Sequence, residues 1–174
     1  MVAADAERGG HLATALERTA ADYDATPYTS HAFPLTQPGR LSAIARMFGL
    51  QAPPVPTARV LELGCAAGGN LLPQAQRFPD AHFLGVDLSG VQVEHGRRRL
   101  GRLELKNIEL RHGSITDVGE ADGPFDYIIC HGVYSWVPEA VREAILRIVA
   151  TQLSDNGVAT MRRIASRTAS GTQE

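Results

Sequence analysis

Two acidic residues, Glu62 and Asp87, each end a short apolar segment, and a turn of small residues follows the first of them. The turn consists of Gly64-Cys65-Ala66-Ala67-Gly68-Gly69-Asn70. Small residues let a backbone come close to a ligand, and a helix that begins at such a turn offers free N–H groups. The pattern therefore predicts either a ligand-binding turn or a tight structural turn between a strand and a helix.

The position of Asp87 favours a ligand. Asp87 follows the glycine turn by roughly 20 residues, which is the separation at which an acid accepts the hydroxyls of a bound ribose. A carboxylate that only caps a helix is the alternative, but Ser89 already occupies the cap position and Gln92 completes a capping-box pattern. We therefore expect Asp87 to bind a ribose.

Glu62 bears on which ribose-containing cofactor fits. A nicotinamide dinucleotide and S-adenosylmethionine both carry a ribose, but the turn does not read Gly-x-Gly-x-x-Gly. A carboxylate at Glu62 suits the cationic amine of a methionine and repels a pyrophosphate. S-adenosylmethionine is therefore the expected cofactor, and a nicotinamide-dependent oxidoreductase is the less favoured alternative.

The surrounding elements place these residues at one edge of a sheet. Apolar segments predict strands over residues 59–63, 82–87, 107–111 and 125–130, and a fifth that starts at 158 after an Asn156-Gly157 turn. Helices are expected over 69–78, after Ser89, and over 139–153. This alternation predicts an α/β, doubly wound, Rossmann-like parallel sheet whose ligand binds beyond the carboxyl ends of the strands.

Three regions are expected along the chain. Residues 1–56 form an N-terminal helical and loop segment, with helical stripes at 12–19 and 41–48, a loop over 24–40 and a proline-rich linker over 52–56. Residues 57–161 form the cofactor-binding core, and residues 162–174 form a polar, disordered tail.

Composition narrows the class of protein. The 174 residues suit one domain, and 44% hydrophobic with 21% charged residues is typical of a globular protein. The net charge of −2 predicts no nucleic-acid or membrane partner, and the acidic N-terminus predicts a cytoplasmic location without a signal peptide. No metal is expected, because no residue set has ligand spacing. Cys65 and Cys130 are expected to be buried reduced thiols.

Four segments in the right order resemble the motifs of the class I S-adenosylmethionine-dependent methyltransferases. They are Glu62-Leu63-Gly64-Cys65-Ala66-Ala67-Gly68, Val86-Asp87-Leu88-Ser89, Gly113-Ser114-Ile115-Thr116-Asp117 and Phe125-Asp126-Tyr127-Ile128-Ile129. A closer resemblance, at 23–30, 61–70 and 131–138, is to a bacterial group that carries a methyltransferase regulatory domain and includes protein-lysine methyltransferases.

The resemblance implies a role for each cofactor-site residue. It places Glu62, Gly64, Ala66 and Gly68, with Cys65 and Asn70 in the same turn, on the methionine part of the cofactor, and Asp87 on the ribose. Leu88 would lie against the adenine. Ser114 stands where the family often has an acid for the adenine amine, so Asp117 would substitute beside Ile115. Cys130 and His131 would border the methionine end through their backbone, and Tyr28 would close over the cofactor or simply pack.

His131, Tyr134 and Trp136 are the candidate catalytic residues, because they follow the fourth strand, where a methyl acceptor would approach. Aromatic faces attract a sulfonium or an amine. Trp136 packing beneath the next helix is the alternative. His131 is interpreted as a pocket residue before a general base, since methyl transfer depends mainly on alignment and burial can deprotonate a lysine acceptor.

The sequence ends before the two further strands that the resembled fold has, so a C-terminal truncation with an exposed edge strand is expected. Three hypotheses follow. The chain is an active methyltransferase, with an acceptor that includes a protein lysine among the candidates, or a cofactor-binding remnant without turnover, or, least favoured, a nicotinamide-binding oxidoreductase. The sequence does not identify the acceptor or the oligomeric state.

Overall fold

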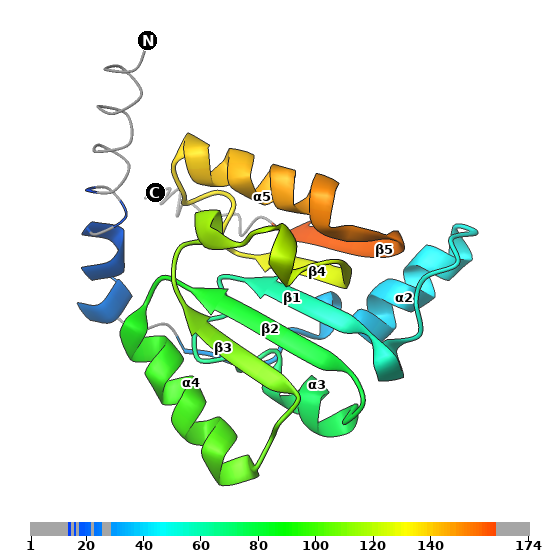
Figure 1. The fold of residues 1–174 in the computed structure, drawn as a ribbon, viewed down its shortest axis with the longest axis horizontal. Helices are drawn as coiled ribbons and strands as arrows, with labels where there is room; N and C mark the ends of the chain where they lie inside the picture. The colour runs from blue at the N-terminus through cyan, green and yellow to red at the C-terminus, as the bar shows by residue number, and fades with distance from the viewer. Residues whose placement is uncertain (1–13, 15, 17, 22, 26–28, 163–174) are drawn as a thin grey trace, which may run out of the picture.

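The computed structural model describes residues 14, 16, 18–21, 23–25 and 29–162. Its centre is a five-stranded parallel sheet with the order β3-β2-β1-β4-β5 (Figure 1). The strands are β1 (Arg59–Leu63), β2 (His82–Asp87), β3 (Ile108–His112), β4 (Phe125–His131) and β5 (Leu153–Arg162). The predicted doubly wound α/β class is confirmed.

Helices cover both faces of this sheet, as Figure 1 shows. One face packs on α2 (Pro38–Met47), α3 (Leu72–Arg77) and α4 (Gly90–Leu103), and the other packs on α5 (Glu139–Gln152). Short 3-10 turns lie at Pro34–Thr36, Val55–Thr57, Ile115–Asp117 and Glu120–Asp122. Residues 14, 16, 18–21 and 23–25 are helical as well.

The central strand β1 is buried from both sides. Val60, Leu61 and Leu63 have no exposed surface, which is typical of a strand in a parallel sheet covered on both faces. Glu62 interrupts this apolar run with an acid that is only 3% exposed. A buried carboxylic acid in a central strand costs free energy, so its presence indicates a functional position.

Three predicted boundaries were wrong. Helix α3 begins at Leu72 rather than 69, because the turn occupies the preceding residues, and α2 begins at Pro38, inside the predicted loop. Asn156 and Gly157 lie within β5 rather than in a turn before it. Strand β5 advances from Leu153 to Val158 while β4 advances only from Phe125 to Tyr127, so an irregularity in the pairing absorbs the extra residues.

Some expectations lie outside the described residues. These are residues 163–174 of the predicted tail, Tyr28, and Leu12 and Ala15 of the predicted N-terminal stripe, whereas Arg162, the first residue of that tail, is the last residue of β5. Leu16 of that stripe is described and packs against the cluster beneath α5. The division of the chain at residue 56 stays a prediction.

The change in strand order falls between β1 and β4, because the chain adds β2 and β3 on one side of β1 and then β4 on the other. The segments after these strands meet there: the β1 loop (residues 64–71) and the β4 loop (residues 132–138). Gly64 has φ +77°, and a Cβ at this position would overlap the side chain of Val133. Glycine is therefore required for the two loops to cross.

Candidate functional site

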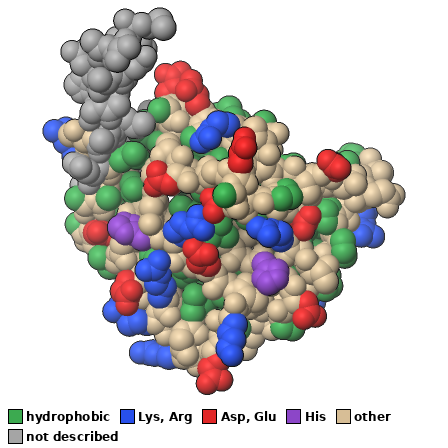
Figure 2. All heavy atoms as spheres, viewed as in Figure 1, with side chains coloured by type: hydrophobic (Ala, Val, Ile, Leu, Met, Phe, Trp, Pro, Cys, Tyr) green, Lys and Arg blue, Asp and Glu red, His purple; other side chains and the backbone are tan. Residues whose placement is uncertain are grey.

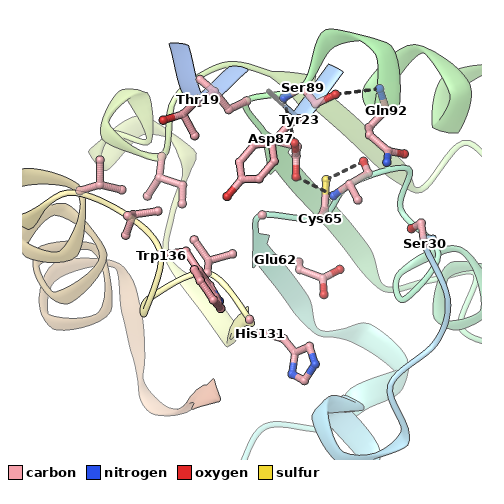
Figure 3. Close-up of a pocket in the computed structure, with 18 of the residues that line it drawn as sticks. Thr19, Tyr23, Ser30, Glu62, Cys65, Asp87, Ser89, Gln92, His131 and Trp136 are labelled. Atoms are coloured by element: carbon pink, nitrogen blue, oxygen red, sulfur yellow. Dashed lines mark hydrogen bonds between the residues drawn. The ribbon is translucent and has the colours of Figure 1, made fainter. Parts of the chain in front are cut away.

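A cavity of about 520 Å³ opens at the carboxyl ends of the strands. This volume lies within the range of small-molecule sites, and the position is where α/β sheets bind ligands. Figure 3 shows Asp87 and Tyr23 on one side of the opening and Glu62 and His131 on the other. Of the residues predicted for the site, those on its wall are Glu62, Gly64, Cys65, Ala66, Asn70, Asp87, Leu88, Ser114, Ile115, His131 and Trp136.

Four predicted site residues are absent from the wall of this cavity. Gly68, with φ +71°, faces the side chains of Leu72 and Leu110 and so shapes the turn from behind. Asp117 accepts a hydrogen bond from the Ser114 N–H at 2.9 Å, which holds the loop after β3 in place. The Cys130 side chain is fully buried in the apolar cluster between the sheet and α5. Tyr134 is partly buried and packs against that cluster.

Asp87 is held as a carboxylate by two backbone N–H groups. Ala66 donates to one oxygen at 2.7 Å, and Ser89 donates to the other at 2.9 Å. Burial raises the pKa of Asp87, and these two amides oppose that rise. Each oxygen keeps lone-pair capacity, so the carboxylate can still accept two hydrogen bonds from a ligand.

Ser89 caps α4 as predicted, by accepting a hydrogen bond from the Gln92 N–H at 3.2 Å. The Ser89 N–H, which a reciprocal capping box would use, donates to Asp87 instead. The Asp87 side chain is therefore positioned by the same turn that begins α4. The cap at Ser89 is thus confirmed, whereas the predicted capping box with Gln92 was wrong.

Glu62 has a different environment. Its Oε1 accepts a hydrogen bond from Asn70 Nδ2 at 2.8 Å, and its Oε2 has no hydrogen-bond partner among the described residues. Burial raises the pKa of Glu62 to about 8, with a smaller contribution from the charge of Asp87 and opposition from Asn70. A ligand cation that reaches Oε2 would restore the ionised form.

The N-terminal strap (residues 29–36) forms one wall of the cavity. The Gly69 N–H donates to Ser30 Oγ at 2.8 Å, and the Phe33 N–H donates to Asn70 Oδ1 at 2.9 Å. A Cβ on Gly69 would lie 2.5 Å from the Ser30 carbonyl carbon, so glycine is required where the strap crosses the β1 loop.

The structure also brings to the site several N-terminal residues that the sequence did not predict there. Leu16, Thr19 and Tyr23 are on the cavity wall, and Asp24 accepts a 2.5 Å hydrogen bond from Ser89 Oγ. The only signal in the sequence was the resemblance at 23–30, from which Tyr28 alone was assigned. Others that were missed are Thr29, Ser30, His31, Phe33, Ser89, Gln92, Gly132, Val133, Val137, Pro138 and Val141.

The rings of His31, Phe33 and His131 pack against one another in tilted arrangements on one side of the cavity. The ring centroids of Phe33 and His131 are 4.0 Å apart, and those of His31 and Phe33 are 4.6 Å apart. Burial, together with the charges of Arg162 and His31, lowers the pKa of His131, so its ring is neutral near pH 7. Its Nδ1 is buried without a hydrogen-bond partner among the described residues.

Trp136 lines the cavity and is 59% exposed. That exposure contradicts the alternative in which it packs beneath the next helix. Cys65 and Cys130 are free and buried as expected, and burial raises the pKa of both thiols, that of Cys130 to about 11.

The face of the molecule in Figure 2 is mixed in charge: Lys and Arg side chains lie among Asp and Glu side chains. Within the described ranges, no group of three or more His, Cys, Asp or Glu residues could hold a metal ion. No helix in that part of the chain is long and apolar enough to span a bilayer.

Comparison with known proteins gives the family. The methyltransferase domain family matches residues 60–157. An uncharacterised protein of Rickettsia prowazekii is 53% identical over 137 residues, which cover 79% of this chain and 25% of that protein. A trans-aconitate 2-methyltransferase of Deinococcus radiodurans is 34% identical over 58% of this chain and 36% of that protein.

The structure of PKMT2 from Rickettsia typhi, in complex with AdoHcy, superimposes with a TM-score of 0.74 at 44% identity over 76% of this chain and 26% of that chain. The chain thus spans about a quarter of the length of PKMT2 and of the Rickettsia prowazekii protein. With more than half of its residues matched and the fold in agreement, the chain belongs to the methyltransferase domain family, among the class I S-adenosylmethionine-dependent methyltransferases.

Proposed function

We propose that this chain binds S-adenosylmethionine and transfers its methyl group to an amine. The observation that carries the proposal is the pair of acids at the ends of adjacent strands. Asp87 offers two carboxylate oxygens that can still accept hydrogen bonds, and Glu62 offers a buried oxygen without a partner among the described residues. A ribose with two hydroxyls and an α-ammonium group on one ligand would satisfy both.

The remaining walls suit the rest of that ligand. Leu88 and Ile115 offer apolar surface on the side of Asp87, where an adenine would lie. Gly64 and Ala66 leave the backbone of the β1 loop open to the methionine part. A pyrophosphate is disfavoured, because it would bring negative charge to a wall that already carries Glu62 and Asp87.

S-adenosylmethionine supplies, when bound, an electrophilic methyl group on a sulfonium. The task of the chain is then to align an acceptor lone pair and to exclude water. We assign His131, Phe33 and Trp136 to the acceptor side of the cavity. Their rings would attract a cationic amine on entry, and the apolar surroundings would favour its neutral, nucleophilic form. Neutral His131 can accept a hydrogen bond from that amine.

A protein lysine is the acceptor that we propose. The side chain of lysine is long enough to bring an amine into a cavity whose mouth carries an exposed Trp136. The similarity to PKMT2, and the resemblance to a bacterial group that includes protein-lysine methyltransferases, support a lysine as the acceptor. A protein that binds the cofactor without turnover is the second candidate, because the two acids that carry the proposal serve the cofactor and not the acceptor.

Calorimetry with the whole chain tests cofactor binding. S-adenosylmethionine and S-adenosylhomocysteine should bind with micromolar affinity, and NAD should not bind. Failure of both adenosyl ligands to bind a folded chain would overturn the proposal, and so would binding of NAD as tight as that of the adenosyl ligands.

Transfer is tested separately with methyl-labelled S-adenosylmethionine and poly-L-lysine. Label should appear on poly-L-lysine and be absent from fully acetylated poly-L-lysine, which has no free amine. Cofactor binding without label on the amine polymer would contradict lysine transfer and support the second candidate.

A further inference from the structure

We propose that Asn70 is a positioning residue that couples the N-terminal strap to the cofactor-binding acid: its amide fixes one oxygen of Glu62 and leaves the other facing the cavity. This inference rests on the proposed function, because it assumes that the free oxygen receives the ammonium of the ligand. The role differs from the direct cofactor contact that the sequence suggested for Asn70.

The hydrogen bonds of the Asn70 amide carry the inference. Oδ1 accepts from the Phe33 N–H at 2.9 Å, and Nδ2 donates to Glu62 Oε1 at 2.8 Å and to Thr36 Oγ1 at 3.1 Å. Both amide hydrogens are therefore used. Asn70 is 4% exposed, so water cannot replace these partners at low cost. An amide with no donor left acts on the ligand through Glu62.

The same bonds connect two distant segments. Phe33 and Thr36 belong to the strap, and Glu62 belongs to the central strand. Thr36 is fully buried and also donates to the Phe33 carbonyl at 3.0 Å, so the strap presents its two Asn70 partners as one unit. If the strap leaves the β1 loop, Asn70 loses two of its three hydrogen bonds and Glu62 loses its fixed orientation.

The acid–base state of Glu62 gives this role a measurable consequence. The pKa of Glu62 is about 8, and Asn70 is the group that lowers it. A ligand ammonium must therefore displace a proton below about pH 8, and its affinity should rise with pH and then level off. Removing Asn70 should move that midpoint to higher pH.

Several other titratable groups face Glu62 or its neighbours. They are Asp87 from β2, Cys65 from the β1 loop, and Cys130 and His131 from β4, with His31 of the strap beside His131. The pKa values of both thiols are raised, and that of His131 is lowered below 6.5. Asp87 would contact the ribose of any adenosyl ligand, so its effect cancels when two such ligands are compared.

The experiment compares S-adenosylhomocysteine with 5′-methylthioadenosine, which is a nucleoside thioether without the ammonium, between about pH 6.5 and 8.5. In the wild type, only S-adenosylhomocysteine should gain affinity as pH rises. Asn70→Leu should move the midpoint upward by about one pH unit, above the range measured, so the affinity for S-adenosylhomocysteine should be about tenfold lower at pH 7 and should still be rising at about pH 8.5 without levelling off. Binding of 5′-methylthioadenosine should stay unchanged and report that the variant is folded.

Two variants control the result. Asn70→Asp keeps an acceptor for the Phe33 N–H but puts a charge beside Glu62, and should shift the midpoint in the same direction. Asn107→Leu is the matched structural control, because Asn107 Nδ2 bonds three backbone carbonyls at the other end of the sheet. It should lower stability and leave the midpoint unchanged.

Each adverse outcome has a distinct meaning. An equal loss of both ligands at every pH in Asn70→Leu would overturn the inference and leave Asn70 a purely structural residue. An unshifted midpoint in both Asn70 variants would overturn it as well. Failure of the wild type to bind either ligand would instead overturn the proposed function.

Discussion

Glu62 and Asp87 are acids on neighbouring strands, but their two carboxyl groups differ in burial and in hydrogen-bond partners. Glu62 pairs with Gly85 in the register of β1 and β2, so the two carboxyl groups reach the same cavity from adjacent strand ends. Asp87 is half-buried and accepts hydrogen bonds from two backbone N–H groups. Glu62 is 3% exposed and accepts one hydrogen bond from a side chain, and its other oxygen has no partner in the part of the chain that the structure describes. The two backbone N–H groups favour the carboxylate form of Asp87, whereas under the proposed function Glu62 ionises when a ligand cation binds.

The two acids differ as well in what positions them. Asp87 is held by its own turn and the adjoining β1 loop. Glu62 depends on Asn70, which in turn depends on the strap. The contrast implies that the ribose half of the site is preorganised, while the methionine half is completed by the strap and the ligand.

Loss of Asp87 should have the largest effect. Asp87→Ala removes two charged hydrogen bonds to a ribose, and we expect about 100-fold weaker binding of both S-adenosylhomocysteine and 5′-methylthioadenosine, which corresponds to about 3 kcal/mol. Calorimetry measures both affinities. The exposed Asp80→Ala is the matched control and should bind normally. Unchanged affinity in Asp87→Ala would remove the ribose assignment.

Glu62→Gln should affect one ligand only. The amide keeps the shape of the side chain but cannot form an ion pair. The affinity for S-adenosylhomocysteine should therefore fall about 30-fold at pH 8, which corresponds to about 2 kcal/mol. Binding of 5′-methylthioadenosine should not change. An equal loss of both ligands would mean that Glu62 and Asp87 do not serve different parts of the cofactor.

Stability should fall with rising pH because of Glu62. Its pKa is about 8 in the folded chain against 4.5 as the ordinary value, so the unfolded chain loses this proton first. The contribution is fully present below about 4.5 and disappears as pH rises through about 8, at up to about 1.4 kcal/mol per pH unit.

Denaturant unfolding between about pH 6.5 and 8 measures this slope, in a window where His131, whose pKa is lowered, stays neutral. Glu62→Gln should flatten the slope. A slope that persists unchanged in this variant would show that Glu62 is already ionised in the folded chain.

Trp136→Ala should have the smallest effect. Trp136 is 59% exposed, so the free energy of unfolding should change by less than about 1 kcal/mol. A lost contact between the ring and a cationic amine should lower methyl transfer to poly-L-lysine about fivefold, with little change in S-adenosylhomocysteine affinity. Normal transfer by the variant would overturn the assignment of Trp136 to the acceptor side of the cavity.

Local patterns in the sequence predicted the ribose half of the site well. The strand that ends at Asp87 and the cap at Ser89 depend on neighbours a few residues away, and both are present in the structure. The parallel, doubly wound sheet followed from the alternation of strands and helices. These features are set by short-range chemistry that a single sequence displays.

The methionine half was harder to predict, because it depends on contacts between distant residues. Asn70 forms hydrogen bonds with Phe33 and Thr36, which lie more than thirty residues before it in the sequence, and no sequence periodicity predicts such bonds. The same applies to Ser30, whose Oγ accepts a hydrogen bond from the Gly69 N–H. In β5, Asn156-Gly157 looked like a turn, but both residues lie inside the strand, at the irregularity between the paired residues Leu153 and Val158.

A crystal structure of the whole chain with S-adenosylhomocysteine tests the central claim most directly. We expect both ribose hydroxyls within hydrogen-bond distance of the Asp87 carboxylate, and the ligand ammonium on Glu62 Oε2 while Asn70 still holds Oε1. A ligand whose ammonium lies away from Glu62, or whose ribose lies away from Asp87, would contradict the division of the site between these two acids.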